Sequence, residues 1–436
     1  MPQELIGRSA ERERLRELVA GAHRGSGGIV VLCGDAGIGK TRLTQALGSD
    51  ALVLRGTAAQ GRTAPYGPLV AVLRAHLHAH PGAFDDLGPL RGHLALLLPE
   101  LGEPAEQVDR LALFEALRAA LGEIAARHQA VVVLDDLQWS DEATLEVLSA
   151  LAEPLRELPL LVVATHRTDG LPRDHGVRRL RNELRRAGHL QVICLKPLDL
   201  AETAALLEQA LDEPPSAGLV RAIHDRTEGI PFFVEELAAA LRVSGALRCT
   251  RRGAELADDG EVPLPDTVRD AVLISASELS PAGRRAAEVA AVAGETFDLG
   301  LVAGLASEDG LTDLIESGMA GEAGDGTGAF RHALAREALY LDIPWAGRRR
   351  LHGQIAEALE ASGAGSREVA PHWLGARAGE RARGALLRAA VESEAVHAYR
   401  DAAEAGRQAL ELWPDDLADG RAEALERYAR CCQLAS

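Results

Sequence analysis

A glycine-rich stretch near the N-terminus combines residue types and spacing that are suited to phosphate chemistry. Residues 34–41 read GDAGIGKT and directly follow the apolar run 29–33. In a Gly-x4-Gly-Lys-Thr loop, backbone N–H groups cradle phosphates, the lysine reaches the β- and γ-phosphates, and the threonine hydroxyl binds Mg²⁺. Lys40 is one of only two lysines among 47 basic residues, and a compact ammonium suits this position better than an arginine fork does. The pattern predicts an ATP/ADP site with Mg²⁺.

The loop is expected to wrap the nucleotide with its backbone. Glycine permits conformations and close approaches that side chains block. The helix that follows presents unpaired N–H groups to an anion. The alternative is a glycine-rich turn in which the Gly-Lys-Thr order arose by chance, and we give the other lysine, Lys196, no role. The predicted nucleotide-binding residues of the loop are Gly34, Asp35, Ala36, Gly37, Ile38, Gly39, Lys40, Thr41 and Arg42.

Two carboxylates at the end of another apolar run supply the expected second partner for the metal. The run 131–134 is followed by Asp135 and Asp136. Asp135 would hold Mg²⁺, directly or through water, together with Thr41, and Asp136 would orient the attacking water. The alternative is an aspartate pair that merely begins a loop. Lys40 and the two aspartates form most of the predicted catalytic set.

An arginine completes that set. Arg167 ends the apolar run that closes with Ala-Thr-His-Arg, at the edge of the sheet where ligands collect. We expect it to sense the γ-phosphate, the alternative being an ordinary surface arginine. The arginine-rich run 178–186 favours a solvated helix face over a nucleic-acid patch.

The first half of the chain alternates strand and helix patterns. Near-continuous apolar runs, unlike in–out alternation, are typical of parallel strands buried on both faces. Helical patterns cover 109–127 and 141–157. The alternation predicts an α/β P-loop NTPase fold, a parallel sheet with helices on both faces. The predicted strands are 28–33, 51–56, 130–135, 159–165 and 190–195.

The second half is mainly helical in pattern. A glycine-rich break at 318–328 is expected to form the hairpin wing of a winged-helix domain. Ala402, Ala409 and Pro414 have the offsets of a tetratricopeptide (TPR) unit, and only about one and a half units fit before the end, so the chain looks cut short. The predicted domains are a P-loop NTPase core (1–195), a helical lid (196–245), a winged-helix domain (246–345) and a helical TPR-like region (346–436).

Composition narrows the class of protein. The formal net charge of −18 argues against this chain gripping nucleic acid electrostatically. The five cysteines are scattered without a CxxC pair, which favours a reducing compartment with no cysteine metal site and no disulfide. The N-terminus lacks a signal-peptide apolar core, and no apolar run approaches the roughly 20 residues of a membrane span. We expect a cytoplasmic protein without membrane partners.

The ordered landmarks of the chain resemble the signal-transduction ATPases with numerous domains (STAND NTPases). Within them the chain is most similar to the large ATP-binding regulators of the LuxR type, with a layout like that of the maltose regulator MalT. The landmarks are LIGR (5–8), GDAGIGKT (34–41), VVVLDDLQWSDEATLEVL (131–148), VVATHR (162–167), GIPFFVEEL (229–237), LPDTVRDAVL (264–273) and FRHALAREALY (330–340).

This resemblance implies further nucleotide contacts. Ile6, Gly7 and Arg8 would line the adenine side, and Pro231 would close over the base from the lid. His332 would touch the β-phosphate of ADP, the alternative being a structural histidine at a domain seam. Where the family usually has Glu after Gly-Arg, this chain has Ser9, which puts one contact at the helix start in question.

The resemblance also implies a function, a slow ATPase used as a signalling switch that controls transcription. ADP would hold the switch closed, an inducer or protein partner at the C-terminal helices would open it, and the ATP state would self-associate. DNA would be read only by a C-terminal domain absent from this chain. The alternatives are a small-molecule phosphotransferase, or the same ATPase module regulating a kinase or cyclase.

Overall fold

The protein folds into two compact units, each assembled from segments that are distant in sequence. The first comprises Met1–Ser9, Gly34–Leu43 and Leu195–Ile355, and the second comprises Ala10–Cys33, Thr44–Cys194 and Ala356–Ser436. The finer four-domain division stays a prediction, and its boundary at 245/246 lies outside the described residues. The structure, a computed structural model, describes residues 5–47, 51–58, 64–107, 109–168, 171–172, 174–243, 247–250, 253–256, 268–324, 326–414 and 420–435.

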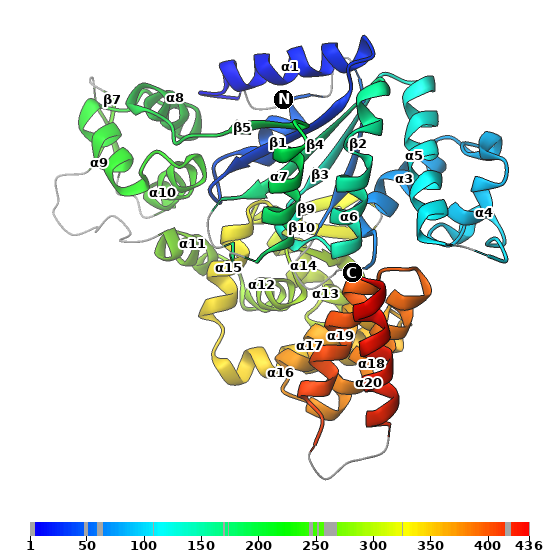
Figure 1. Ribbon diagram of the computed structural model, residues 1–436. Coiled ribbons are helices and arrows are strands. Elements are labelled where there is room, and N and C mark those ends of the chain that lie inside the picture. Colours follow the sequence, from blue (N-terminus) through cyan, green and yellow to red (C-terminus); the bar gives the residue numbers. More distant parts are fainter. Residues whose placement is uncertain are drawn as a thin grey trace. The chain divides into compact units, whose positions relative to one another are not determined.

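A parallel five-stranded sheet is the centre of the second unit (Figure 1). Its strand order is β2-β3-β4-β1-β5, so β4 lies between β1 and β3. All six residues of β3 are buried, which explains why its sequence is a continuous apolar run rather than an alternation. The predicted sheet is confirmed. Its strands are β1 (Gly28–Gly34), β2 (Leu52–Thr57), β3 (Ala130–Asp135), β4 (Leu160–Arg167) and β5 (Leu190–Cys194).

Helices of the same unit pack their apolar faces on this sheet. The helix predicted at 109–127 is confirmed, and the one predicted at 141–157 ends early, since Pro154 opens a separate 3₁₀ turn. The helices are α1 (Ser9–His23), α3 (Gly67–Ala79), α4 (Leu90–Leu94), α5 (Arg110–Arg127), α6 (Glu142–Leu151) and α7 (Gly176–Arg186), with 3₁₀ turns at Asp85–Leu87, Pro99–Leu101, Leu137–Trp139 and Pro154–Glu157.

The C-terminal part of the second unit is helical, as expected. Small buried residues, among them Ala402 and Ala409, let neighbouring helices approach closely around an alanine-rich core. One of these helices, α19, packs against α6, which lies beside the parallel sheet. The helices are α17 (Ser366–Gly375), α18 (Gly379–Ala395), α19 (Tyr399–Glu411) and α20 (Arg421–Leu434).

The first unit is mainly helical, with two small antiparallel sheets. The hairpin expected at 318–328 is present as β9 (Ala320–Gly324) and β10 (Thr327–Phe330), and β8 (Thr296–Asp298) joins β10. That this part is a winged helix stays a prediction. A second hairpin, β6 (Leu247–Thr250) with β7 (Gly253–Leu256), was not expected.

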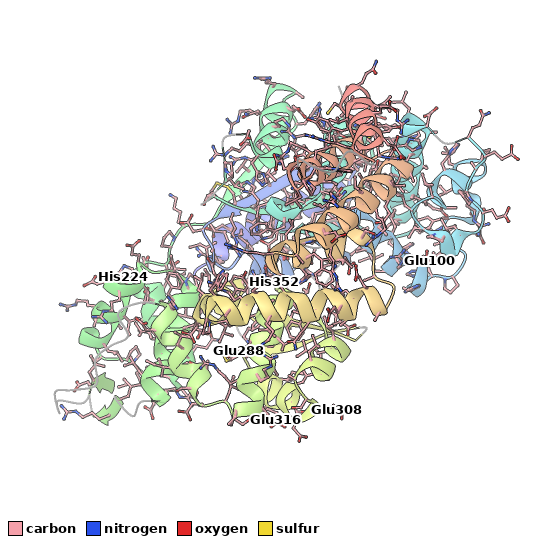
Figure 2. The ribbon with its side chains drawn as sticks, turned by 90° about the horizontal axis from the view of Figure 1, so that it is seen from below. Glu100, His224, Glu288, Glu308, Glu316 and His352 are labelled. Carbon is pink, nitrogen blue, oxygen red and sulfur yellow. A yellow bond between two sulfur atoms is a disulfide. The ribbon has the colours of Figure 1, made fainter. Side chains whose placement is uncertain are left out.

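Helices surround these hairpins, and Figure 2 shows two of their histidines, His224 on α9 and His352 on the long helix α16. The helices that lie wholly or mainly in this unit are α2 (Lys40–Gln45), α8 (Leu200–Leu211), α9 (Ala217–Thr227), α10 (Pro231–Val243), α11 (Val268–Ser277), α12 (Pro281–Ala293), α13 (Leu299–Leu305), α14 (Glu308–Glu316), α15 (Ala333–Asp342) and α16 (Trp345–Ala361).

The prediction of no disulfide is wrong. Cys33 and Cys194 are bonded to each other across β1 and β5, where they are register partners with Cα atoms 4.6 Å apart. A separation of 161 residues hides this pairing from any local cysteine pattern, because only the strand register brings the two together. Cys431 and Cys432 are free thiols. None of the helices in the described part of the chain is long and apolar enough to cross a membrane.

Candidate functional site

The phosphate loop has the geometry that its sequence predicts. Lys40 begins α2 and is 7% exposed, and its ammonium donates hydrogen bonds to the backbone oxygens of Gly34 and Asp35, each at 2.9 Å. Gly37 and Gly39 have φ angles of +75° and +99°, which side chains with a Cβ rarely adopt. A curled backbone, a cationic side chain and a helix start fit a phosphate group.

Phe232, in the predicted lid (196–245), contacts this loop at a point where only glycine fits. A Cβ on Gly37 would lie 2.8 Å from the Cβ of Phe232, and the Phe232 N–H donates to the Gly37 oxygen at 3.2 Å. Pro231 is the first residue of α10, directly before Phe232. The fold therefore brings Pro231 next to the phosphate loop, although its contact with a base stays a prediction.

The N-terminal segment meets the same loop. The Arg8 side chain is 4% exposed and its guanidinium donates to the Ile38 oxygen at 3.1 Å. Gly7 has a φ of +70°, and its Cα lies so close to Leu198 at the start of the lid that a Cβ would clash. Ile6 packs on the apolar core of the lid. These three predicted adenine-side residues lie together, beside the loop and the lid.

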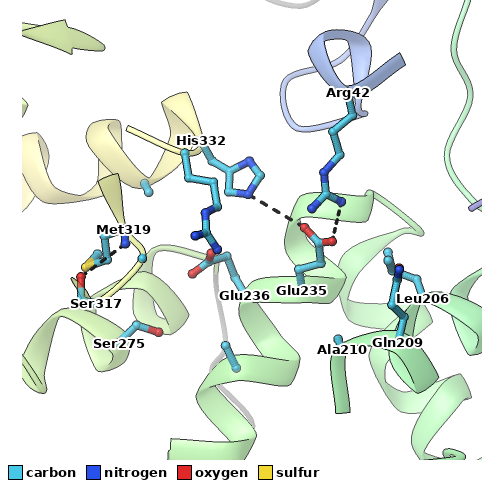
Figure 3. Close-up of a pocket in the computed structure, with 14 residues that line it drawn as sticks. Arg42, Leu206, Gln209, Ala210, Glu235, Glu236, Ser275, Ser317, Met319 and His332 are labelled. Atoms are coloured by element: carbon cyan, nitrogen blue, oxygen red, sulfur yellow. Dashed lines mark hydrogen bonds and ion pairs between the residues drawn. The ribbon is translucent and has the colours of Figure 1, made fainter. Parts of the chain in front are cut away.

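A charged cluster links Arg42, Glu235 and His332, which come from the loop, the lid and the start of α15. The Arg42 guanidinium lies 2.5 Å from a Glu235 carboxylate oxygen, and His332 Nε2 lies 3.9 Å from the other oxygen (Figure 3). The His332 ring also contacts the Phe232 ring, with centroids 4.4 Å apart. Glu235 was missed by the sequence analysis. The sequence feature that could have indicated it is the pair of glutamates in the otherwise apolar segment GIPFFVEEL, because charged residues do not contribute to the packing of an apolar helix face.

Burial sets the charges of this cluster. Burial, together with the cations Arg42 and Arg331, lowers the pKa of His332 to about 3, so the imidazole is neutral at pH 7. Burial and the Glu235 charge, partly opposed by Arg331, raise the pKa of Glu236 to about 7. These side chains line a cavity of about 240 Å³ in the first unit.

The predicted catalytic carboxylate of the second unit, Asp135, is held by a threonine. Asp135, 7% exposed, is the last residue of β3, and Thr165 on the adjacent strand β4 donates its hydroxyl to Asp135 Oδ1 at 2.5 Å. The same hydroxyl accepts the N–H of Asp136 at 2.9 Å. Thr165 is fully buried and was not predicted as a site residue. Its position in VVATHR becomes meaningful only once β4 is known to neighbour β3.

Asp136 and Arg167 are joined through one glutamine. Asp136 has a left-handed backbone, with φ of 57°, and Gln138 donates its amide N–H to Asp136 Oδ1 at 2.7 Å. The Gln138 side-chain oxygen accepts the N–H of Arg167 at 3.0 Å. Gln138 thereby fixes the two predicted catalytic positions relative to each other, and it too was missed from sequence.

The topology explains how one sheet edge can serve this chemistry. Parallel strands end at the same edge, where β3 delivers Asp135, β4 delivers Arg167, and the chain leaves β1 for the phosphate loop. Hydroxyl and carboxylate oxygens, of the kind that Thr41 and Asp135 offer, are ligands that suit Mg²⁺. Within the units as described, the structure groups the loop with the lid and His332, and groups the two aspartates with Arg167.

Comparison with known proteins shows which proteins this chain resembles. Residues 4–163 match the AAA ATPase domain. An uncharacterized protein of Rhizobium meliloti is 26% identical over 98% of this chain, which spans 44% of that protein's length. A solved structure from Pyrococcus horikoshii, a Signal Transduction ATPase with Numerous Domains (STAND) protein with a tetratricopeptide repeat sensor, matches with a TM-score of 0.57 at 14% identity. This match covers 99% of this chain and 59% of that one.

Residues 4–163 are therefore similar to AAA ATPase domains, and the fold of the chain is similar to that of a STAND protein. The AAA match covers the phosphate loop and both aspartates. At 14% identity the structural likeness concerns the fold alone. The chain spans only part of both relatives, so the activity and partners of a longer protein are matters for proposal.

Proposed function

We propose that the protein is an ATP/ADP-dependent switch with slow ATP hydrolysis. One observation carries the proposal: the phosphate loop, the predicted lid and the start of α15 are tied together. Phe232 contacts both the Gly37 backbone and the His332 ring, and Arg42 forms an ion pair with Glu235. A phosphotransferase needs an open site for the molecule that accepts the phosphate. The contacts seen here instead allow a bound nucleotide to hold three segments of the chain together. A ligand shifts such an equilibrium only through contacts that differ between the two states.

The chain's own residues would divide the work as follows. Lys40 and the loop backbone bind the phosphates, and Ile6, Gly7, Arg8 and Pro231 enclose the base. His332, neutral at pH 7, donates or accepts one hydrogen bond toward the β-phosphate. Asp136 orients the water that attacks the γ-phosphorus as the bond to the ADP oxygen breaks. Arg167 senses the γ-phosphate, and Mg²⁺ held by Thr41 and Asp135 would neutralise developing negative charge.

The output of the switch is proposed on the family resemblance. The C-terminal helices would receive an inducer or protein partner, ATP would promote self-association, and the whole would act in the cytoplasm. We propose transcription as the controlled process, as in LuxR-type regulators, with DNA bound by a domain that is not among these 436 residues. Regulation of a kinase or cyclase by the same module is the alternative output.

The first test is to purify the chain without added nucleotide, denature it and identify what is released by chromatography. We expect ADP in near-equal amount to protein. The Lys40→Ala chain should release little nucleotide when it is denatured. It should bind added ADP at least about 100-fold more weakly, because the loop loses the positive charge that faces the phosphates. Lys196→Ala is the matched control, since it removes the chain's other lysine.

Two outcomes would overturn the switch. One is a wild-type chain that exchanges nucleotide rapidly and consumes ATP at tens per second with a particular small-molecule acceptor, which would favour the phosphotransferase. The other is a Lys40→Ala chain that binds nucleotide and assembles like wild type. Either result leaves the fold intact and rejects the function.

A further inference from the structure

Three histidines gather in the second unit where helices α3 and α5 end, shortly before strand β3 begins. His76 lies in the last turn of α3, His80 follows as its C-cap, and His128 is the C-cap of α5. One ring nitrogen from each lies within 4.8 Å of the others. We call these three residues the histidine cluster. All of them belong to the second unit.

The rings of the histidine cluster lie close to one another and are buried or half-buried. Their centroids lie 4.6 Å (His76–His80), 4.9 Å (His80–His128) and 5.7 Å (His76–His128) apart. His76 is 1% exposed. The Nδ1 atoms of His76 and His80 are buried and have no hydrogen-bond partner among the described residues. Buried polar atoms normally have a partner, so two unsatisfied nitrogens beside a third ring call for an explanation.

We propose that the histidine cluster binds a single Zn²⁺ ion through one nitrogen of each ring, with water at the fourth position. Neutral imidazole is the histidine form that ligates metals, and three histidines plus water is a coordination that zinc adopts. An all-nitrogen set disfavours Mg²⁺ and Ca²⁺, which take oxygen ligands. The ion would satisfy the orphaned nitrogens.

The electrostatic surroundings agree with this assignment. Burial lowers the pKa of His76 to about 4, with smaller contributions from His80, His128 and Arg127, so the ring is neutral at pH 7. The Arg127 charge is offset by Asp86 at 3.0 Å and Glu123 at 2.6 Å. Zn–N bonds of 2.0–2.1 Å place tetrahedral nitrogens about 3.3 Å apart, so modest ring rotations would close the site.

The site would have a structural task, separate from hydrolysis. Strand β3 runs from Ala130, two residues after His128, to Asp135, and this strand spans about 17 Å at 3.3 Å per residue. A bound ion would tie the end of α3 to the end of α5, directly before β3 begins. We therefore expect metal to change the stability of the second unit more than its ATP turnover.

The test uses the full chain, stripped with a chelator, with its disulfide intact and no nucleotide present. Zn²⁺ is titrated in competition with a chromophoric chelator, and Co²⁺ is used to record the visible bands of a tetrahedral site. We expect one ion per chain. His80→Gln and His128→Gln should each weaken Zn²⁺ binding. Because they remove a ligand of the ion, the loss should exceed the factor of about 10 to 100 that is typical when a hydrogen-bond partner of a ligand is removed.

His78→Gln is the matched control, because His78 lies on the same helix but is exposed and outside the cluster. It should bind Zn²⁺ as wild type does, and Zn²⁺ should raise its melting temperature equally. If a cluster variant does not fold, protection of His80 and His128 from diethyl pyrocarbonate by Zn²⁺ in the wild type replaces it. Equal binding by wild type and cluster variants, or no protection, would show that the three rings only pack together.

Discussion

At the scale of single residues, Thr165 is the feature that most directly controls the predicted chemistry. Its hydroxyl bonds both Asp135 and the Asp136 backbone, and it is fully buried. Thr165→Val keeps the shape but removes one hydrogen bond from each of these two groups, at a cost of about 1–3 kcal/mol. We expect the rate of ATP hydrolysis to fall about 10- to 100-fold while ADP affinity changes little, because the phosphate loop is untouched.

Steady-state hydrolysis at saturating ATP, together with ADP titration, checks this prediction. Thr165→Ser is the control, since it retains the hydroxyl and should keep most of the activity. A Thr165→Val chain that hydrolyses ATP like wild type would show that the threonine only packs the sheet.

Glu236 gives the second prediction at this scale, a dependence of stability on pH. Its pKa rises from 4.5 to about 7 on folding, chiefly by burial. Between these pH values the folded chain holds a proton that the unfolded chain has released, so the free energy of unfolding falls as pH rises. Glu236→Gln cannot ionise, so its free energy of unfolding does not fall in this way. The difference in free energy of unfolding between the variant and the wild type should therefore shift in favour of the variant by up to about 3 kcal/mol from pH 4.5 to pH 8.

Urea unfolding at several pH values measures the effect. Glu208→Gln is the matched control, because Glu208 is an exposed glutamate on α8 of the same lid. Parallel pH curves for wild type and Glu236→Gln would contradict the prediction.

At the scale of elements, the seam between α6 and α19 contains a buried carboxylate beside the Arg400–Glu146 ion pair. Asp401, 5% exposed, accepts the N–H groups of Glu142 and Ala143 at 3.3 and 3.1 Å, and the Arg367 guanidinium lies 3.0 Å away. Asp401→Ala removes the carboxylate that pairs with Arg367 and that accepts two helix-start N–H groups. We expect the free energy of unfolding of the second unit to drop by about 3 kcal/mol.

Chemical denaturation measures this loss. Asp401→Asn retains an acceptor oxygen and should cost less. Arg407→Ala, which removes exposed pairs with Glu404 and Glu411 on the same helix, should cost under about 1 kcal/mol. Similar losses for Asp401→Ala and Arg407→Ala would show that the seam is not held by Asp401.

The elements that could be predicted from sequence are those whose signal is local. The five strands are continuous apolar runs, and the phosphate loop is a contiguous motif, so both were identified correctly. Thr165, Glu235 and the Cys33–Cys194 bond depend on strand order, register or the packing of distant segments. The histidine cluster depends on α3 and α5 ending side by side. No periodicity in the sequence encodes these neighbours.

At the scale of the whole molecule, charge governs how copies of the chain can meet. Each copy carries a formal net charge of −18, so association must overcome mutual repulsion. Screening shortens the range of this repulsion from about 10 Å at 0.1 M salt to about 3 Å at 1 M. If the ATP state self-associates through surfaces that are not themselves ion-paired, its oligomer should therefore become more populated as salt rises.

Light scattering after size-exclusion chromatography checks this expectation. The chain is measured at both salt concentrations, with either a non-hydrolysable ATP analogue or ADP at saturating concentration. We expect a higher mass with the analogue, increasing with salt, and no such increase with ADP. Lys40→Ala should stay at the ADP-state mass, whereas Lys196→Ala should follow wild type. Equal masses with both nucleotides would reject an assembly controlled by the nucleotide. An oligomer that dissociates as salt rises would instead indicate an interface of complementary charges, in which basic and acidic side chains pair locally although each copy is acidic overall.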